Sequence, residues 1–461
     1  MKPVTSWDFH PYNPPLRDFG GIYVCRLAPS KNAVHVEWLD ADEKEYTVSY
    51  AKRGSAEGQS LTVYGTECDI TALDENEDYE ITVRAGEKYS RTRLAHTADA
   101  VGDTVVNYLH PDDEAYAFSG RYLCSPTIVR HPDGFLLAGM DVFKANAPQN
   151  LELIFRSDDD GKTWHYVSEL YPCFWGRLFI YENSLYMLSC STEYGDLLIG
   201  RSDDGGKTFT VPTVLLRGGC KCNVAGVHKN PQPPVIFDGR MWFTMEWGAW
   251  AIGTHAAMVG SFPVGADPLD AANWLFSEPC PYDPSWKGVA EGPSAGNIEG
   301  TLVVFPDGGL YNVMRYDMGR AKPRFGRVLA YRVNTKEPEA PLVYDHAIEL
   351  PGNHSKFMIR YDEVSGCYYT VICRITDPGK VSDRRLLSLM KSKDCEKWEL
   401  ACDLMDFRDK AEAEAVGFQY PDFFIEGEDI FLLCRTAMNG AANFHDANYS
   451  TFHRIRNFRL L

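Results

Sequence analysis

Polar and charged residues stand at the start of several short apolar runs, where packing alone would not ask for them. They are Arg177, His228, Asn230, Gln232, Asn297, Glu299, His354, Lys356, Gln419, Tyr420 and Asp422. An imidazole can give or take a proton near neutral pH, a carboxylate can accept one from a weak acid, and a guanidinium can hold a carboxylate in two-pronged geometry. These residue types therefore suit proton transfer and anion binding, provided that one scaffold brings them together.

Two octapeptides predict the local structure of that scaffold. Residues 157–164 and 202–209 share the frame Ser-x-Asp-x-Gly-x-Thr-aromatic, and each follows a short apolar run. An Asp bonds its own backbone, a Gly supplies a positive φ, and an aromatic ring packs back between strands. Each octapeptide therefore closes a β-hairpin, and its recurrence indicates a repeat.

The repeat extends through residues 101–461. Pairs of apolar runs joined by a short polar turn recur, each followed by a third strand, and the pairs cover 125–134, 176–183, 234–239, 301–308, 356–366 and 422–428. Repeats built only of short strands are typical of propellers and solenoids. Six units predict an all-β, six-bladed β-propeller, whose ring closure protects strand edges. A seven-bladed ring is the competing interpretation, because residues 214–230 or the insertion after Gly260 could hold further strands.

Residues 1–100 do not follow this unit and are predicted to form a separate small β-sandwich. Stretches 34–39, 46–50 and 79–84 alternate in the manner of half-buried strands. The spacing from Leu73 to Tyr79 resembles the tyrosine corner of fibronectin type III modules, with Trp38 as the buried core aromatic. The resemblance implies a spacer or a partner surface rather than a substrate site.

The composition of the chain indicates which classes of partner it can bind and where it is located. A formal net charge of −18 argues against nucleic acid and anionic membranes, so an anionic substrate needs a local basic cluster. No signal-peptide pattern and no membrane-spanning apolar run is evident, and 13 irregularly spaced cysteines suit a reducing compartment, so we expect a cytoplasmic protein unless a leader was removed. The isolated Cys220–Cys222 pair predicts no metal site. We expect no cofactor, and the oligomeric state stays open.

The blade unit and its octapeptides together resemble the sialidase superfamily, with its Asp-box or BNR repeats. Residues 299–315 are similar to the family's fourth-blade motif, in which a glutamate opens the inner strand and an arginine closes the next. Residues 420–423, Tyr-Pro-Asp-Phe, are similar to the family's Tyr-Ser-Asp-Leu. The resemblance implies that Tyr420 is a nucleophile and Glu299 its base. A phenol, with an ordinary pKa of about 10, needs such a base to react.

The same resemblance implies carboxylate-binding arginines. Arg315 closes the fourth-blade motif, and Arg384 or Arg385 takes the place of a second arginine. The residues at strand starts expected to line the substrate are Arg177, Asn297, Lys356 and Asp422. The closing stretch 444–455 resembles the end of sialidase-like proteins of unsettled activity from polysaccharide-degrading bacteria, which adds His445 with its neighbour Asp446.

Two departures from the family pattern concern the chemistry. The first inner strand carries Cys124 where the family has its third arginine, and Arg121 lies three residues upstream. The loop at 144–150, which normally supplies an acid/base aspartate, has no carboxylate, and Asp141 before it is a weak substitute. Without a proton donor, hydrolysis loses a factor of about 10²–10⁴. His228 is the best candidate for that donor.

Three functions follow from these residues. The first is an exo-acting, sialidase-like glycoside hydrolase on a carboxylate-bearing glycan, with Tyr420, Glu299 and His228 as its catalytic groups. The second is a uronic-acid-directed polysaccharide lyase on the same fold, which would use His228 and Tyr420 for β-elimination. The third is a carbohydrate-binding propeller without catalysis, for which the missing arginine and aspartate are the evidence. In each case the predicted partner is an acidic oligosaccharide.

Overall fold

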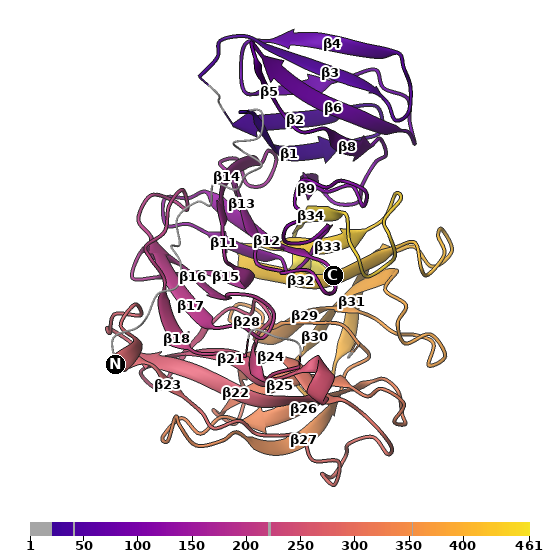
Figure 1. Cartoon of the computed structure of the whole chain (residues 1–461). Helices are drawn as coiled ribbons and strands as arrows, with labels where there is room; N and C mark the ends of the chain where they lie inside the picture. Colours follow the sequence, from indigo (N-terminus) through magenta and orange to yellow (C-terminus); the bar gives the residue numbers. More distant parts are fainter. Residues whose placement is uncertain (1–20, 40–41, 220–222, 353) are drawn as a thin grey trace.

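A computed structural model describes residues 21–39, 42–219, 223–352 and 354–461 of the chain. These residues form a small β-sandwich and a ring of six sheets, with the sandwich at the top of Figure 1. The Cys220–Cys222 pair lies outside the described residues. Three short 3₁₀ turns accompany the strands: η1 (Trp250–Ile252), η2 (Ala271–Asn273) and η3 (Phe458–Leu460). In the described ranges, no helix has the length and apolarity that crossing a membrane requires.

The sandwich consists of two antiparallel sheets. One contains β1 (Tyr23–Pro29), β2 (Val34–Leu39) and β5 (Glu67–Ile70), and the other contains β3 (Tyr46–Lys52), β4 (Gly58–Val63), β6 (Asp78–Ala85), β7 (Lys88–Tyr89) and β8 (Arg93–His96). Trp38 packs edge-on against Tyr46 between them, with ring centroids 5.3 Å apart. The backbone N–H of Asp74, the residue after Leu73, donates to the Tyr79 hydroxyl at 3.0 Å.

Six antiparallel blades make up the ring, and each blade has its first strand toward the centre. Blade 1 contains β10 (Tyr122–Leu123), β11 (Thr127–Arg130), β12 (Leu136–Phe143), β13 (Glu152–Ser157) and β14 (His165–Leu170), and blade 2 contains β15 (Phe174–Tyr181), β16 (Ser184–Cys190), β17 (Leu197–Ser202) and β18 (Thr213–Leu216). Blade 3 contains β19 (Gly226–His228), β20 (Val235–Phe237), β21 (Arg240–Ala249), β22 (Thr254–Pro263) and β23 (Leu275–Phe276), and blade 4 contains β24 (Gly296–Val304), β25 (Leu310–Asp317), β26 (Arg327–Arg332) and β27 (Val343–Glu349). Blade 5 contains β28 (Ile359–Asp362), β29 (Cys367–Cys373), β30 (Leu386–Ser392) and β31 (Glu399–Asp406), and blade 6 contains β32 (Gly417–Glu426), β33 (Asp429–Ala437), β34 (Tyr449–Ile455) and β9 (Thr104–Tyr108).

The ring closes through a strand that the sequence repeat does not predict. β9 precedes the first blade in sequence, yet it pairs with β34 as the outer strand of the sixth blade, with Tyr108 opposite Tyr449. Among the described residues there is no seventh blade, because 214–230 and the insertion after Gly260 supply strands of blades 2 and 3. The all-β, six-bladed prediction is therefore confirmed, and the seven-bladed alternative is wrong.

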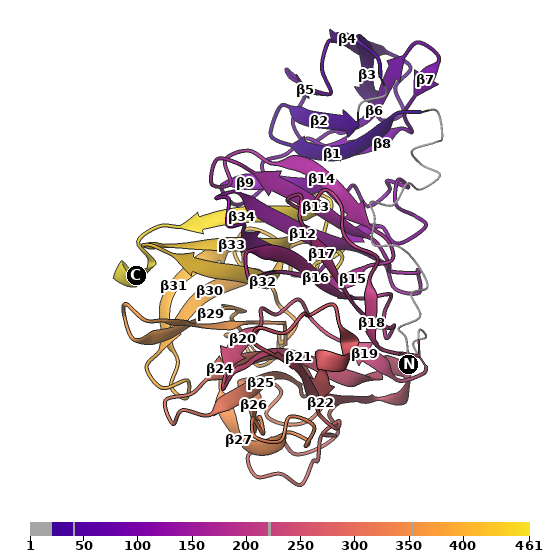
Figure 2. The ribbon, with the colours of Figure 1, turned by 90° about the vertical axis from the view of Figure 1, so that its left-hand side faces the viewer.

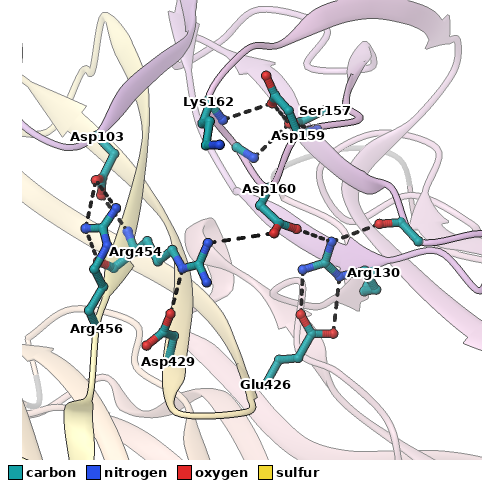
Figure 3. Close-up of polar contacts among 12 residues, drawn as sticks. Asp103, Arg130, Ser157, Asp159, Asp160, Lys162, Glu426, Asp429, Arg454 and Arg456 are labelled. Carbon is teal, nitrogen blue, oxygen red and sulfur yellow. Dashed lines mark hydrogen bonds and ion pairs between the residues drawn. The ribbon is translucent and has the colours of Figure 1, made fainter.

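The first octapeptide holds the seam between the first and last blades (Figure 3). Within it, Asp159 accepts hydrogen bonds from the backbone N–H groups of Lys162 and Thr163 at 3.1 and 2.9 Å. Next to it, Arg130 of β11 pairs with Asp160 at 2.7 Å and with Glu426 of β32 at 2.5 Å. The octapeptide is thus a structural turn on the outside of the ring.

The sandwich rests on blade 1 and on β9, as Figures 1 and 2 both show. Arg93 of β8 forms a buried ion pair with Asp113 at 2.7 Å. The hydroxyl of Tyr23 donates to the Glu169 carboxylate of β14 at 2.9 Å. Moving the sandwich away would leave a buried charge and a buried carboxylate without these partners, so both contacts favour this placement of the sandwich on the propeller.

Candidate active site

Three inner strands share one irregularity that turns a side chain toward the centre of the ring. β15, β24 and β32 each contain a β-bulge, and one residue in each bulge has a positive φ: Trp175 at 53°, Glu299 at 54° and Tyr420 at 53°. A non-glycine residue in this conformation costs about 1–3 kcal/mol, and such strain gathers at functional sites. The three bulges therefore mark one end of the channel as the candidate site.

Two of these residues bond to each other across the channel. The Tyr420 hydroxyl donates to Oε1 of Glu299 at 2.6 Å, and Arg315 donates to Oε2 of the same carboxylate at 2.5 Å. Burial alone would raise the pKa of Glu299, but Arg315, His228 and the Tyr420 hydrogen bond bring that pKa below its usual value. Burial and Glu299 together raise the pKa of Tyr420. The pair is thus a neutral phenol on an ionised carboxylate.

A third arginine, Arg435, which the sequence analysis did not predict, lies beside the Tyr420 ring. Arg435 of β33 lies with its guanidinium carbon 5.0 Å from the centre of the Tyr420 ring, and it donates a hydrogen bond to Sγ of Cys124 at 2.9 Å. Arg121 instead pairs with Glu114 at 2.8 Å, away from this position. Arg435 of the sixth blade thus contacts the cysteine that stands on the first inner strand.

The register of the strands contains the signal that could have found Arg435. In blade 4, Arg315 stands opposite Ile298, the residue before the bulge. In blade 6, Arg435 stands opposite Gln419 in the same relation to its bulge. The two arginines are therefore equivalent positions of two blades, and counting strand ends in blade 6 would have predicted the second.

The structure distinguishes the two adjacent arginines of blade 5. Arg384 donates to the side chain of Gln419, and its charge acts on the pKa of Tyr420. Arg385 pairs with Asp383 at 2.6 Å and donates to two backbone carbonyls of the loop that follows β31. Arg384 therefore faces the site together with Arg315 and Arg435.

His228 lies in the same neighbourhood but is enclosed. Its Nδ1 lies 2.6 Å from Oε2 of Glu246, and its ring centre is 4.3 Å from that of Trp175 and 4.9 Å from that of His255. Oε1 of Glu246 accepts from the backbone N–H of Gly300 at 3.1 Å, which places His228 beside the bulge that contains Glu299. A buried imidazole held by a carboxylate is well suited to orienting its neighbours.

Four predicted substrate ligands are buried and bonded to the protein. Arg177 and Asp422 pair with each other at 2.5 Å across the channel. Lys356 donates to a backbone carbonyl of β32 at 3.2 Å, and burial lowers its pKa to about 8. Asn297 accepts from the Tyr331 hydroxyl at 2.8 Å. The Arg177 and Lys356 contacts join inner positions of different blades, the Asn297 contact lies within blade 4, and a substrate role for the four residues stays a prediction.

His445 lies at a more open position beside the arginines. Its Nδ1 is 2.8 Å from Oδ1 of Asp446, and its backbone carbonyl accepts hydrogen bonds from Arg435 and Gln419. Burial, with Arg435, lowers the pKa of His445 to about 4, so the ring is neutral near pH 7. The half-buried imidazole can therefore offer a hydrogen bond to a sugar hydroxyl.

The loop at 144–150, which carries no carboxylate of its own, holds one from the next blade. Gln149 donates to Glu193 at 3.1 Å, and Glu193, half-buried between β16 and β17, has a raised pKa because of burial, which the charge of His228 opposes. Asp141 is fully buried and accepts two backbone N–H groups at 2.8 Å each. Glu193 is thus the half-buried carboxyl beside the loop at 144–150. Sequence reasoning missed it because its contact with that loop depends on how blades 1 and 2 pack.

No protein-family model and no curated protein sequence matches the chain. Among solved structures, an α-L-arabinofuranosidase of Fusarium graminearum bound to an iminosugar inhibitor matches with a TM-score of 0.50 at 13% identity, over 73% of this chain and 93% of that one. An α-L-arabinanase of Penicillium chrysogenum complexed with arabinobiose matches at 0.48 and 14%, over 77% and 97%. A Trypanosoma rangeli sialidase with the inhibitor DANA matches at 0.49 and 15%, over 74% and 56%. At such identities the likeness shows the fold alone, which is that of a β-propeller.

Proposed function

We propose that this protein is an exo-acting glycoside hydrolase whose substrate is a glycan ending in a carboxylate-bearing sugar. The observation that carries the proposal is the 2.6 Å hydrogen bond from Tyr420 to the ionised Glu299, surrounded by three arginines. A phenol brings no formal negative charge to a reaction centre that already has a carboxylate beside it. The arginines supply charge-assisted hydrogen bonds to that carboxylate.

The reaction follows from the hydrogen bond. As the phenol oxygen of Tyr420 attacks the anomeric carbon, its proton passes to Glu299, and the bond from that carbon to the leaving oxygen breaks. Water then attacks the anomeric carbon, the bond from that carbon to the phenol oxygen breaks, and Glu299 returns the proton to that oxygen. Glu299 begins this cycle ionised because Arg315 stabilises its charge.

The leaving oxygen needs a proton, and we assign that step to Glu193. Burial raises its pKa above the ordinary glutamate value, which is the direction that a general acid requires. It stands beside the loop at 144–150, and it is less enclosed than His228. In the second half of the cycle the same carboxylate would accept a proton from the attacking water.

The charge of the site favours an acidic sugar over a neutral one. A neutral arabinofuranoside, the kind of substrate named for the Fusarium enzyme, would leave Arg315, Arg384 and Arg435 without a substrate counter-charge. Three guanidinium groups gathered around one phenol select a single terminal carboxylate, which supports exo-action. The neighbour's name agrees with glycoside hydrolysis but carries no part of this argument.

Product analysis tests the proposal. The protein is incubated with oligosaccharides that are labelled at the reducing end and carry a sialic acid or a uronic acid at the non-reducing end. Release of that terminal monosaccharide as a saturated sugar supports hydrolysis. An unsaturated product with new ultraviolet absorbance would replace the proposal by β-elimination. Binding without any product would leave a carbohydrate-binding propeller.

A further inference from the structure

A second group of titratable side chains lies where the sandwich meets blade 1. His35 and Glu37 project from β2, Glu67 begins β5, and His165 begins β14 directly after the first octapeptide. Ligand atoms of His35, Glu37 and Glu67 all lie within 4.8 Å of one another. Nδ1 of His165 is 3.2 Å from Glu67 and 3.9 Å from Glu37. Three strands of two different folding units therefore bring two imidazoles and two carboxylates to one point.

A fifth residue fixes the tautomer of one imidazole. Asp69 accepts from Nδ1 of His35 at 2.9 Å, which leaves Nε2 as the unprotonated nitrogen. That Nε2 is buried, it lies 3.8 Å from Oε2 of Glu67, and no hydrogen-bond partner for it exists among the residues that the structure describes. A carboxylate on one ring nitrogen with the other nitrogen vacant is the arrangement of a metal-bound histidine.

We propose that His35 Nε2, Glu37, Glu67 and His165 Nδ1 form a zinc site that joins the sandwich to the propeller. Zinc takes four nitrogen or oxygen ligands at about 2.0–2.2 Å, which places the ligand atoms of a tetrahedron about 3.3–3.5 Å apart. The separations of 3.2 Å (His165 to Glu67), 3.8 Å (His35 to Glu67) and 3.9 Å (His165 to Glu37) are close to that spacing. His165 lies outside the group whose ligand atoms are all within 4.8 Å of one another, so its ring, which is 48% exposed, has to turn toward His35 to complete the tetrahedron. Mixed imidazole and carboxylate ligands favour zinc over calcium or magnesium.

The charges around the site agree with a bound cation. Both oxygens of the Glu37 carboxylate accept from the backbone N–H of Tyr166, at 3.0 and 3.2 Å, and this bond orients the carboxylate in the way that an outer hydrogen bond orients a metal ligand. The nearby guanidinium of Arg26 donates to the backbone carbonyls of Val105 and Val106 at 3.0 and 2.7 Å, so its hydrogen bonds are directed elsewhere. A divalent cation would satisfy the two glutamates.

An entry path for the ion exists. A cleft between the sandwich and the propeller is lined by His35, Glu67 and Asp69 on one side and by Trp164 and His165 on the other. Because the ligands come from both units, bound zinc would resist their separation. The proposal is independent of any glycosidase activity, since the site lies on the sandwich side of blade 1.

Calorimetric titration of the chelator-treated full chain with zinc chloride tests the site. We expect one zinc per chain and a rise in the unfolding temperature on binding. His35→Gln and Glu67→Gln should each weaken zinc binding by about tenfold or more, and Asp69→Asn by about 10–100-fold through loss of ligand orientation. His346→Gln is the matched control, because His346 also stands between two carboxylates, Asp345 and Glu396, but has no second imidazole.

A second readout keeps the result independent of folding. Cobalt in place of zinc should give the visible spectrum of a tetrahedral nitrogen–oxygen site in the unaltered protein, and His165→Gln should change that spectrum. The proposal is overturned if zinc fails to bind, if zinc binding survives both His35→Gln and Glu67→Gln in folded protein, or if magnesium or calcium binds in preference to zinc.

Discussion

Arg435 donates a hydrogen bond to Sγ of Cys124 at 2.9 Å, and this contact explains how the site keeps a third arginine without one on the first inner strand. Burial raises the pKa of the Cys124 thiol to about 12, so the sulfur stays neutral and imposes no ion pair on the guanidinium. Arg435 is therefore held in place while its charge remains for Tyr420 and for a ligand. A small neutral residue at position 124 makes room for an arginine from another blade.

Removing either member of the central pair should abolish efficient turnover. Glu299→Gln keeps the shape but cannot accept the phenol proton, so kcat should fall about 10²–10⁴-fold, and Tyr420→Phe should cost at least as much. Steady-state kinetics on the substrate identified by product analysis measures both losses. Tyr361→Phe, at an exposed tyrosine of blade 5, is the control. Full activity in Tyr420→Phe would refute the assigned nucleophile.

The arginines should act on the substrate carboxylate. Arg435→Gln and Arg384→Gln should each raise KM about 10–100-fold for the acidic substrate, because a hydrogen bond to a charged group contributes about 1.5–3 kcal/mol. The methyl ester of the same substrate should show little of this effect. Arg385→Gln should leave KM unchanged, since that side chain pairs with Asp383. Equal KM changes for acid and ester would argue against carboxylate recognition.

Glu193 should matter in proportion to the difficulty of the leaving group. Glu193→Gln should slow cleavage of natural glycans about 10²–10⁴-fold but leave aryl glycosides with acidic phenol leaving groups nearly unaffected, because those need no proton. The ratio of the two rates is the measurement. Glu399→Gln, at an exposed carboxyl on β31, serves as the control. An equal loss with both substrates would exclude Glu193 as the proton donor.

The pH profile should follow from two carboxyl groups shifted in opposite directions. Glu299 must be ionised, so activity is lost as pH falls through its pKa, and because that pKa is lowered the acid limb should lie below the ordinary glutamate range. Glu193 must be protonated, so activity is lost as pH rises through its raised pKa. In kcat/KM against pH, Glu193→Gln should remove the alkaline limb alone. An unchanged alkaline limb would assign it to another group.

Local patterns were sufficient to predict the blades, and a family resemblance was needed to predict the central pair. Turn chemistry and alternating apolar runs depend on neighbouring residues, and they placed Glu299 and Tyr420 at the starts of inner strands. That these two residues and Arg315 come together was implied by the resemblance to the sialidase superfamily, and the structure brings them into contact. The pairing of Arg177 with Asp422 could not be predicted in this way, because it depends on which blades face each other across the channel.

Contacts between side chains of different blades could not be predicted from local patterns either. Arg435 reaches Cys124 from a strand far along the chain, and Glu193 reaches the loop at 144–150 through Gln149. The closing strand β9 likewise joins the sixth blade from before the first. Such contacts depend on ring closure, which sequence spacing predicts as a fold but not residue by residue.

The seam between blades 1 and 6 should be sensitive to one methyl group. Gly161 has a φ of +86°, and a Cβ there would lie 2.1 Å from the ring of Phe452 in β34. Gly134 has a φ of +94° but no atom within 4 Å of its Cβ position. Gly134→Ala should therefore cost only about 1–2 kcal/mol of backbone strain. Gly161→Ala should add about 1–3 kcal/mol of overpacking to a similar strain. Thermal unfolding of the two variants measures the difference, and equal unfolding temperatures would show that Phe452 does not close the seam against the octapeptide.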